Sequence, residues 1–271
     1  MAFGGSPAPA AAGRALLKGE RQQRILARLA SAGRVVANEL QDDLGVSAYT
    51  VRRDLDELAE AGRLRRVHGG ALARSPVATT YAGRSTQEVA GKREVAHAAV
   101  SLLVPGQVAI LDGGSTALAL AEAIPPGLTQ TFVTHSPPAA MALAQHDGVE
   151  VVLVGGTLER RAMVSVGART LEAYAQITAD VLFLGVWSVH AEHGLSEGYH
   201  EEAEVRRLLL GRADRVVGLA SAEKLGTVAP FTIGPAGALT HLVTERSVPA
   251  EALAPFEELG IQVVRSSTGV S

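Results

Sequence analysis

Hydrophobic residues recur at helical spacing through the first quarter of the chain. Three such stretches follow one another, at residues 25–29, 36–44 and 51–58, and a glycine soon follows each: Gly33, Gly45 and Gly62. Apolar positions three and four apart mark the buried face of a helix, and glycine commonly follows a helix's last turn. Residues 63–73 then read as two short strands that turn at Gly69 and Gly70. Three short helices and a hairpin predict a winged helix-turn-helix.

The pattern changes in the rest of the chain, where apolar runs of strand length alternate with helix-length segments. The runs lie at residues 108–111, 131–133, 150–154, 181–184, 216–219, 241–243 and 262–264. Helix-length segments separate most of them, among them residues 92–104, 117–123 and 138–145. Strands that alternate with helices indicate a mainly parallel sheet covered on both faces. The predicted fold class is therefore α/β, with a small winged helix-turn-helix followed by an open, mainly parallel α/β sheet.

Changes in composition divide the chain into four parts. Residues 1–19 are rich in Ala, Gly and Pro without periodicity, which predicts a disordered tail. Residues 20–75 hold the winged helix-turn-helix. Residues 76–91 are small, polar and aperiodic, which predicts a linker or a loosely docked segment. Residues 92–271 form the α/β domain.

Cysteine usage and hydropathy exclude several classes of protein. The chain has no cysteine, which excludes disulfides and thiolate metal sites. Its first residues lack the continuous apolar core of a signal peptide, and it has no run of about 18 apolar residues that could span a membrane. We expect a soluble, cytoplasmic protein without a membrane partner.

The net charge of −3 hides an asymmetry between the two ends of the chain. Residues 1–75 carry 12 Lys and Arg against 8 Asp and Glu, whereas residues 76–271 carry 13 against 20. Residues 61–75 hold four arginines, one histidine and no acidic residue. A basic end on an acidic body suggests a nucleic-acid-binding module joined to a domain of another kind.

Arginines lie on the side of the third predicted helix that faces away from its apolar stripe. If Val51, Leu55 and Leu58 face inward, the opposite side centres on Tyr49 and Arg53. Arginine is well shaped for guanine edges and phosphates, and the basic hairpin could lie along the DNA backbone. The alternative is a solvated helix face with four-apart pairs such as Arg53 with Glu57. The candidate DNA-binding residues are Ser47, Tyr49, Thr50, Arg52, Arg53, Arg63, Arg65, Arg66 and His68.

A second candidate site follows the apolar run 108–111. The sequence Asp112-Gly113-Gly114-Ser115-Thr116 leads from a strand into a helix. Glycines let successive backbone N–H groups converge, the hydroxyls add donors, and the helix N-terminus favours an anion. The alternative is an ordinary strand-to-helix turn capped by Ser115 or Thr116.

Other loops follow predicted strands and should meet the same edge of the sheet, where ligands bind in open α/β folds. These loops are residues 133–136, with Thr134 and His135, residues 154–157, with Gly155 and Gly156, and residues 184–187. Lys224, after a further strand, is a candidate counter-charge for a phosphate, although a solvated surface lysine is the commoner case. Glu202 is a further candidate, added from a family resemblance described below.

The segment 190–204 is rich in histidine and acidic residues, which raises the question of a metal. His190, Glu192, His193 and His200 lie close in sequence, but no helical four-apart histidine pair is present. We predict no metal and no cofactor. His190 or His193 is instead expected to contact an anionic effector, in a way that could depend on pH.

Residues 21–71 resemble the winged helix-turn-helix of the DeoR family of bacterial transcriptional regulators. The resemblance rests on Val46, Ser47, Thr50, Val51, the run Arg52-Arg53-Asp54-Leu55, and the run His68-Gly69-Gly70-Ala71. It implies a sequence-specific DNA-binding regulator, commonly a repressor, whose partner is a double-stranded DNA operator.

Residues 92–245 resemble the effector domain of the same family, which is similar in fold to ribose-5-phosphate isomerase. The matching residues are Asp112–Thr116, Thr134, Gly155, Gly156, Gly167, Gly194, Leu195, Glu202 and Lys224. The resemblance implies a sugar phosphate as inducer and control of carbohydrate metabolism genes. His135, His190 and Ser221 depart from the family pattern at an asparagine and two aspartates. We therefore expect a retained anion pocket whose sugar specificity is either altered or lost.

Three functions remain open from the sequence. The first is a repressor released by a small anionic metabolite. The second is a sugar-phosphate isomerase with an appended DNA-binding domain, which the loss of carboxylates at His190 and Ser221 disfavours. The third is a regulator whose body serves only for assembly. A homo-oligomer is expected, because one winged helix reads too few base pairs for an operator.

Overall fold

The computed structural model describes residues 16–266, and the chain divides into two compact units, Met1–Ala73 and Arg74–Ser271. The tail predicted for residues 1–19 falls mostly outside the described residues. Helix α1 already begins at Lys18, because Leu17 and Glu20 close its N-terminus: the Leu17 N–H donates to the Glu20 carboxylate at 2.8 Å.

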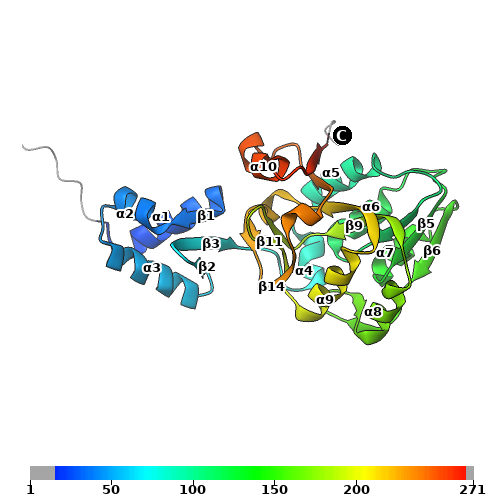
Figure 1. The fold of residues 1–271 in the computed structure, drawn as a ribbon, viewed down its shortest axis with the longest axis horizontal. Coiled ribbons are helices and arrows are strands. Elements are labelled where there is room, and N and C mark those ends of the chain that lie inside the picture. Colours follow the sequence, from blue (N-terminus) through cyan, green and yellow to red (C-terminus); the bar gives the residue numbers. More distant parts are fainter. Residues whose placement is uncertain (1–15, 267–271) are drawn as a thin grey trace, which may run out of the picture. The chain divides into compact units, whose positions relative to one another are not determined.

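The first unit is a three-helix bundle with a β-hairpin (Figure 1). Its elements are α1 (Lys18–Ala32), β1 (Arg34–Val36), α2 (Ala37–Leu44), α3 (Ala48–Glu60), β2 (Leu64–Val67) and β3 (Gly70–Arg74). Strand β3 pairs antiparallel with β2 and with β1. The predicted stripes form the core, in which Ile25, Leu40, Val51 and Leu55 are fully buried or nearly so. The winged helix-turn-helix is confirmed.

The prediction was wrong for one residue of the second apolar stripe, residues 36–44. Val36 was assigned to the buried face of a helix, but it ends strand β1 and is 37% exposed, whereas its neighbour Val35 is buried. The pairing of Val36 with Gly70 holds its backbone extended, so helix α2 starts one residue later.

A seven-stranded sheet forms the centre of the second unit. Its strands, in spatial order, are β16 (Gln262–Arg265), β15 (His241–Thr244), β12 (Ala213–Leu219), β9 (Ala179–Gly185), β4 (Val108–Leu111), β5 (Gln130–Thr134) and β6 (Val149–Leu153). Every neighbouring pair is parallel. The predicted open parallel α/β sheet is confirmed, with all seven strands in place.

Helices cover both faces of this sheet, and alternate strand residues pack against each layer (Figure 1). Phe132 and Phe183 face α5 (Val89–Val100), α6 (Ser115–Glu122) and α7 (Pro137–Leu143). Ile110 and Leu182 belong to the other layer, with α8 (Ala168–Ala175), α9 (His200–Leu209) and α10 (Ala250–Glu257). This alternation follows from the two-residue period of a strand.

Several short elements were not predicted. Strands β7 (Thr157–Glu159) and β8 (Val164–Val166) pair as a hairpin, and β10 (Ser188–His190), β11 (Gly194–Glu197) and β14 (Phe231–Gly234) form a small antiparallel sheet. Strand β13 covers Thr227–Val228, and 3₁₀ turns cover Ala222–Lys224 and Ala236–Ala238.

The segment predicted as a linker, residues 76–91, is folded against the second unit. It contains α4 (Tyr81–Thr86) and the first turn of α5. The Thr80 hydroxyl caps α4, and the buried ammonium of Lys92 donates to the carbonyl oxygens of Arg84 and Gln87 at its end. Polar side chains thus fix a segment whose composition is that of a loop.

Candidate DNA-binding surface and effector pocket

Helix α3 presents the predicted arginine face to solvent. Its Tyr49 is 75% exposed and the Arg53 side chain is 66% exposed, while Val51 and Leu55 are buried on the other side. Arg53 lies 3.3 Å from the Glu57 carboxylate, as in the alternative considered above. An exposed pair of this kind contributes little to stability, so the pair leaves Arg53 available to another partner.

Asp54, between the arginines and the apolar stripe, has a structural role. It is buried, and its carboxylate receives two hydrogen bonds from Arg21 of α1, at 2.7 and 3.1 Å. The hydrogen bond to Asp54 raises the pKa of Arg21 above its ordinary value. This bidentate pair fixes α3 on α1 and therefore the direction in which the arginine face points.

Ser47 and Thr50 form the N-terminus of α3. The Ser47 Oγ accepts from the Thr50 N–H at 3.3 Å and lies 3.0 Å from the Thr50 hydroxyl. The cap determines where the helix begins, and both residues lie in the turn where a phosphate would meet free N–H groups.

The β2–β3 hairpin continues the basic surface. Arg63, Arg65 and His68 are exposed, whereas Arg66 donates to the Asp56 carboxylate at 2.8 Å and to the Gly70 carbonyl. A groove on this unit joins the hairpin to α2 and the start of α3, and its polar lining consists of Asn38, Gln41, Arg52, Arg66 and His68. The structure thus brings predicted residues from the helix and the hairpin together on one groove.

A pocket in the second unit lies at the carboxyl ends of the central strands. Its lining comes from the turns after β4 and β9, from α9, from Lys224 and from the folded segment before α5: Val77, Arg84, Gly113, Gly114, Ser115, Thr116, Gly185, Val186, Trp187, Glu202, Arg206 and Lys224. Strands β4, β9 and β12 are neighbours, so the turns that follow them converge.

One end of this pocket suits an anion. Helix α6 begins at Ser115, and no side chain caps its N-terminus. Gly114 holds φ at 97°, and a side chain on Gly113 would strike Val164, so the turn requires both glycines. Lys224 Nζ donates to the Thr116 hydroxyl at 3.2 Å, and burial lowers the pKa of this lysine to about 8. A bound anion would favour the charged lysine.

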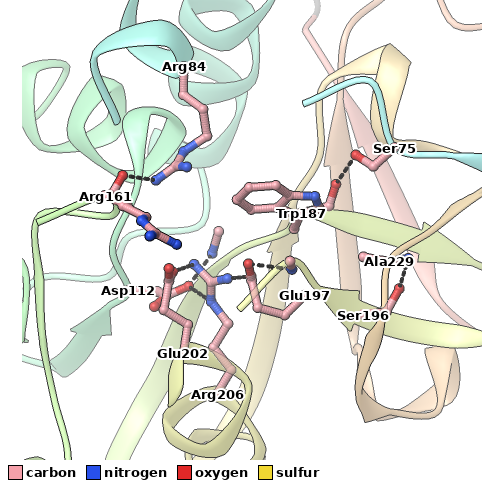
Figure 2. Close-up of polar contacts among 12 residues, drawn as sticks. Ser75, Arg84, Asp112, Arg161, Trp187, Ser196, Glu197, Glu202, Arg206 and Ala229 are labelled. Atoms are coloured by element: carbon pink, nitrogen blue, oxygen red, sulfur yellow. Dashed lines mark hydrogen bonds and ion pairs between the residues drawn. The ribbon is translucent and has the colours of Figure 1, made fainter. Parts of the chain in front are cut away.

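Arg206 lines the pocket and lies among three carboxyl groups (Figure 2). Its Nε donates to Asp112 Oδ2 at 2.8 Å, its Nη1 pairs with Glu197, and its Nη2 lies 3.5 Å from Glu202 Oε2. Asp112 also accepts the Gly185 N–H at 3.0 Å. All four side chains are buried, so they form a network rather than a solvated cluster.

The opposite wall consists of Arg84 and Trp187 (Figure 2). The Arg84 guanidinium lies 5.0 Å from the centroid of the Trp187 ring, and burial lowers the pKa of this arginine. Ser75 donates to the Trp187 carbonyl at 3.1 Å, and the Tyr199 hydroxyl donates to the Thr79 carbonyl. Residues of the segment predicted as a linker are therefore part of the pocket wall.

The structure separates the predicted effector residues into two sets. Gly113, Gly114, Ser115, Thr116, Glu202 and Lys224 line the pocket, whereas Asp112, Thr134, His135, Gly155, Gly156 and His190 do not. Asp112 and His135 lie behind it, with His135 Nε2 3.6 Å from Asp112 Oδ1. The loop of Gly155 packs against Thr170 through a 3.0 Å hydrogen bond, and His190 lies on β10, where its Nδ1 accepts from the Glu192 N–H at 3.1 Å.

The sequence analysis missed Arg84 and Arg206 as pocket residues, whereas Trp187 lies in the loop 184–187 that it had expected at this edge of the sheet. Among residues 16–266, no group of three or more His, Cys, Asp or Glu side chains is arranged to hold a metal ion. Within the same range, no helix is both long and apolar enough to cross a membrane.

A winged helix-turn-helix and an α/β domain with a polar pocket, joined in one chain, are the architecture of a class of transcriptional regulators, and the comparisons show the family. Residues 21–77 match the DeoR-like helix-turn-helix domain and residues 87–246 match the DeoR C-terminal sensor domain. The chain belongs to the DeoR family of transcriptional regulators. The prediction of a regulator rather than an enzyme is thereby confirmed.

Named relatives align with the chain over nearly its whole length. The HTH-type transcriptional regulator GlpR of Haloferax volcanii is 35% identical over 92% of this chain and 98% of its own. The HTH-type transcriptional repressor GlcR of Bacillus subtilis is 29% identical over 84% of this chain and 88% of its own. Among solved structures, ribose 5-phosphate isomerase A of Methanocaldococcus jannaschii matches with a TM-score of 0.36 and 22% identity, over 49% of this chain and 52% of that one.

Proposed function

We propose that this regulator is a repressor of carbohydrate-related genes that binds an operator as a homo-oligomer and is released by a phosphorylated sugar or a related anionic metabolite. The observation that carries the proposal is the joint presence of an exposed arginine face on α3 and a pocket in which Lys224 adjoins the N-terminus of α6. Repression follows the name of the relative GlcR.

The DNA-binding half of the proposal rests on the surface of the first unit. Five candidate residues are exposed: Arg52, Arg53, Arg63, Arg65 and His68. We assign the first two to base edges and the other three to phosphates. A helix-turn-helix places its second helix in the major groove, and a symmetric oligomer pairs two half-sites. A regulator of this kind acts where the DNA is, so cytoplasmic location remains our expectation.

The effector half rests on charge and geometry in the second unit. Lys224, Arg84 and Arg206 surround the pocket, and free N–H groups at the start of α6 favour a phosphate. A phosphorylated compound supplies the matching dianion. A body that serves only for assembly would not require buried cations that face a pocket.

The test is a titration of the purified full chain on DNA from its own upstream region, with and without a panel of sugar phosphates. Specific binding weakened by one of them supports the proposal. Specific binding that no phosphate ester changes would instead support a regulator whose second unit serves only for assembly. Absence of specific binding to any fragment of that region would contradict the operator assignment.

A further inference from the structure

Strand β6 ends the seven-stranded sheet with one side of its backbone open. Among the described strands it pairs with β5 only (Figure 1). The Val154 N–H, just after β6, donates to the Thr134 carbonyl of β5 at 2.8 Å. Because backbone N–H groups alternate in direction along a strand, those of Val151 and Leu153 point away from β5. An open strand edge of this kind is a template for a further strand.

The exposed side chains on β6 are mostly apolar. Val152 is 42% exposed and Leu153 is 51% exposed, and Leu158 on the following strand, β7, is exposed as well. On the other edge strand of the sheet, β16, the exposed side chains are Gln262 and Arg265. Proteins often protect an open edge with a lysine, a proline or a bulge, and β6 has none of these. An unprotected apolar edge indicates a surface that another chain covers.

The two ends of β6 carry opposite charges. Asp147 and Glu150 are exposed at its start. At its end, the Gly155 carbonyl accepts a hydrogen bond from the Thr170 hydroxyl at 3.0 Å, which places the first turn of α8 and its exposed Arg169 there. An antiparallel copy of the same strand brings the acidic start of one β6 to the basic end of the other. The edge is therefore complementary to itself, as a two-fold dimer requires.

The acidic and basic side chains also lie on the same face of the sheet. Val154 packs in the layer that contains α8, whereas Val151 packs in the opposite layer. Glu150 alternates with Val151 and so faces the α8 layer, to which Arg169 belongs. A two-fold axis perpendicular to the sheet keeps this face common to both copies. Such an exposed ion pair adds little affinity but favours the antiparallel orientation, while apolar contact and backbone hydrogen bonds supply the affinity.

We propose that β6 is a dimerisation edge, and that it pairs antiparallel with β6 of a second copy of this chain, about a two-fold axis, to join two seven-stranded sheets into one. The inference rests on the homo-oligomer of the proposed function and assigns a surface to it. It does not depend on which effector the pocket binds.

Sedimentation equilibrium of the full chain, over a range of concentrations, measures the mass of the assembly. Val152→Lys places a charge on the edge, and Leu153→Pro removes an N–H that points outward, at a position where a single edge strand tolerates proline. Val104→Lys is the matched control, because Val104 is 44% exposed and lies in the loop before β4. Circular dichroism and Trp187 fluorescence check that each variant is folded.

Each of the two edge variants should raise the dissociation constant of the dimer by at least about tenfold, because like charges meet or a backbone hydrogen bond is lost. At a concentration where the wild type is assembled, their mass should fall at least to half, and Val104→Lys should keep the wild-type mass. A folded edge variant of either kind with the wild-type mass would overturn the inference and leave the homo-oligomer to another surface. A wild type that is monomeric both alone and on its operator would refute the homo-oligomer itself, and this inference with it.

Discussion

Arg206 Nε lies 2.8 Å from Asp112 Oδ2, and both side chains are buried. The same carboxylate oxygen accepts the N–H of Gly185 at 3.0 Å. One carboxylate thus connects the turn after β4, the end of β9 and helix α9, which are three walls of the pocket. The pair positions these walls relative to one another, and its loss would affect both stability and ligand binding.

Arg206→Leu should lower the free energy of unfolding of the second unit by about 3–5 kcal/mol, because it leaves the carboxylates of Asp112 and Glu197 buried without their counter-charge. Urea unfolding followed by Trp187 fluorescence measures the effect, since the single tryptophan lies in this unit. The control Arg93→Leu, on the exposed face of α5, should change stability by less than about 0.5 kcal/mol. An Arg206→Leu protein as stable as the control would show that the network is not a stabilising element.

Arg53→Ala should weaken specific operator binding by about 1–3 kcal/mol if its guanidinium contacts a base edge. The loss of its exposed pair with Glu57 should change stability much less. Fluorescence anisotropy on operator and unrelated DNA, at one salt concentration, separates specific from non-specific binding. Arg24→Ala removes the same charge from the exposed side of α1 and serves as control. If both variants weaken specific binding equally, Arg53 contributes only its charge.

The sheet was predictable because its central strands, such as β4 and β9, are buried on both faces. Such strands read as continuous apolar runs, and residues 108–111 coincide with β4. The helices of the first unit were predictable for a similar reason, since Val51 and Leu55 fall on one buried stripe. The short strands β10, β11 and β14 lack such a pattern, because three or four residues are too few to show a period.

Only about half of the predicted effector residues line the pocket. The rule that ligands bind at the carboxyl ends of parallel strands does not give the spatial order of those strands. The loops after β5 and β6 were assigned to the pocket, but the pocket lies on the side of β4 that faces β9 and β12. His135 and Gly155 therefore lie outside it. That order depends on contacts between strands far apart in the sequence.

The buried charges depend on similarly distant partners. Arg206 pairs with Asp112, which lies 94 residues away in the sequence, and Arg21 pairs with Asp54 at 33 residues. One signal was present in the sequence of α9. Glu202 and Arg206 occupy the same three- and four-apart stripe as Val205 and Leu209, so charged residues interrupt an apolar face.

Lys224→Gln should lower the affinity for inorganic phosphate by about 1.5–3 kcal/mol, the range of a hydrogen bond to a charged group. In DNA titrations, a phosphate ester should weaken the operator binding of this variant less than that of the wild type, so the ratio of the operator affinities without and with the ester should fall towards one. The readouts are Trp187 fluorescence and anisotropy. Arg169→Gln makes the same charge change on the exposed face of α8 and should behave as the wild type. Unaltered phosphate affinity in Lys224→Gln would remove this lysine from the anion site.

His135 is buried between Tyr174 and Asp112, with Nδ1 2.9 Å from the Tyr174 hydroxyl. Burial lowers its pKa to about 4, the Asp112 charge opposes this and the Arg206 charge adds to it. The unfolded chain therefore binds a proton at this residue below its ordinary pKa of 6.5, while the folded protein does not until about pH 4. Stability from neutral His135 is present above 6.5 and is lost as pH falls towards 4.

His135→Asn should therefore reduce the loss of stability between pH 7.5 and pH 5, measured by urea unfolding with Trp187 fluorescence. The comparison must be made between proteins, because Glu202 acts in the opposite direction. Burial raises the Glu202 pKa to about 8, so its contribution is lost as pH rises. That contribution is common to the wild type and the variant and cancels in the difference. His97→Asn, on the exposed side of α5, should leave the curve unchanged. If the stability of His135→Asn falls between pH 7.5 and pH 5 as much as that of the wild type, burial does not lower the pKa of His135 in the folded protein.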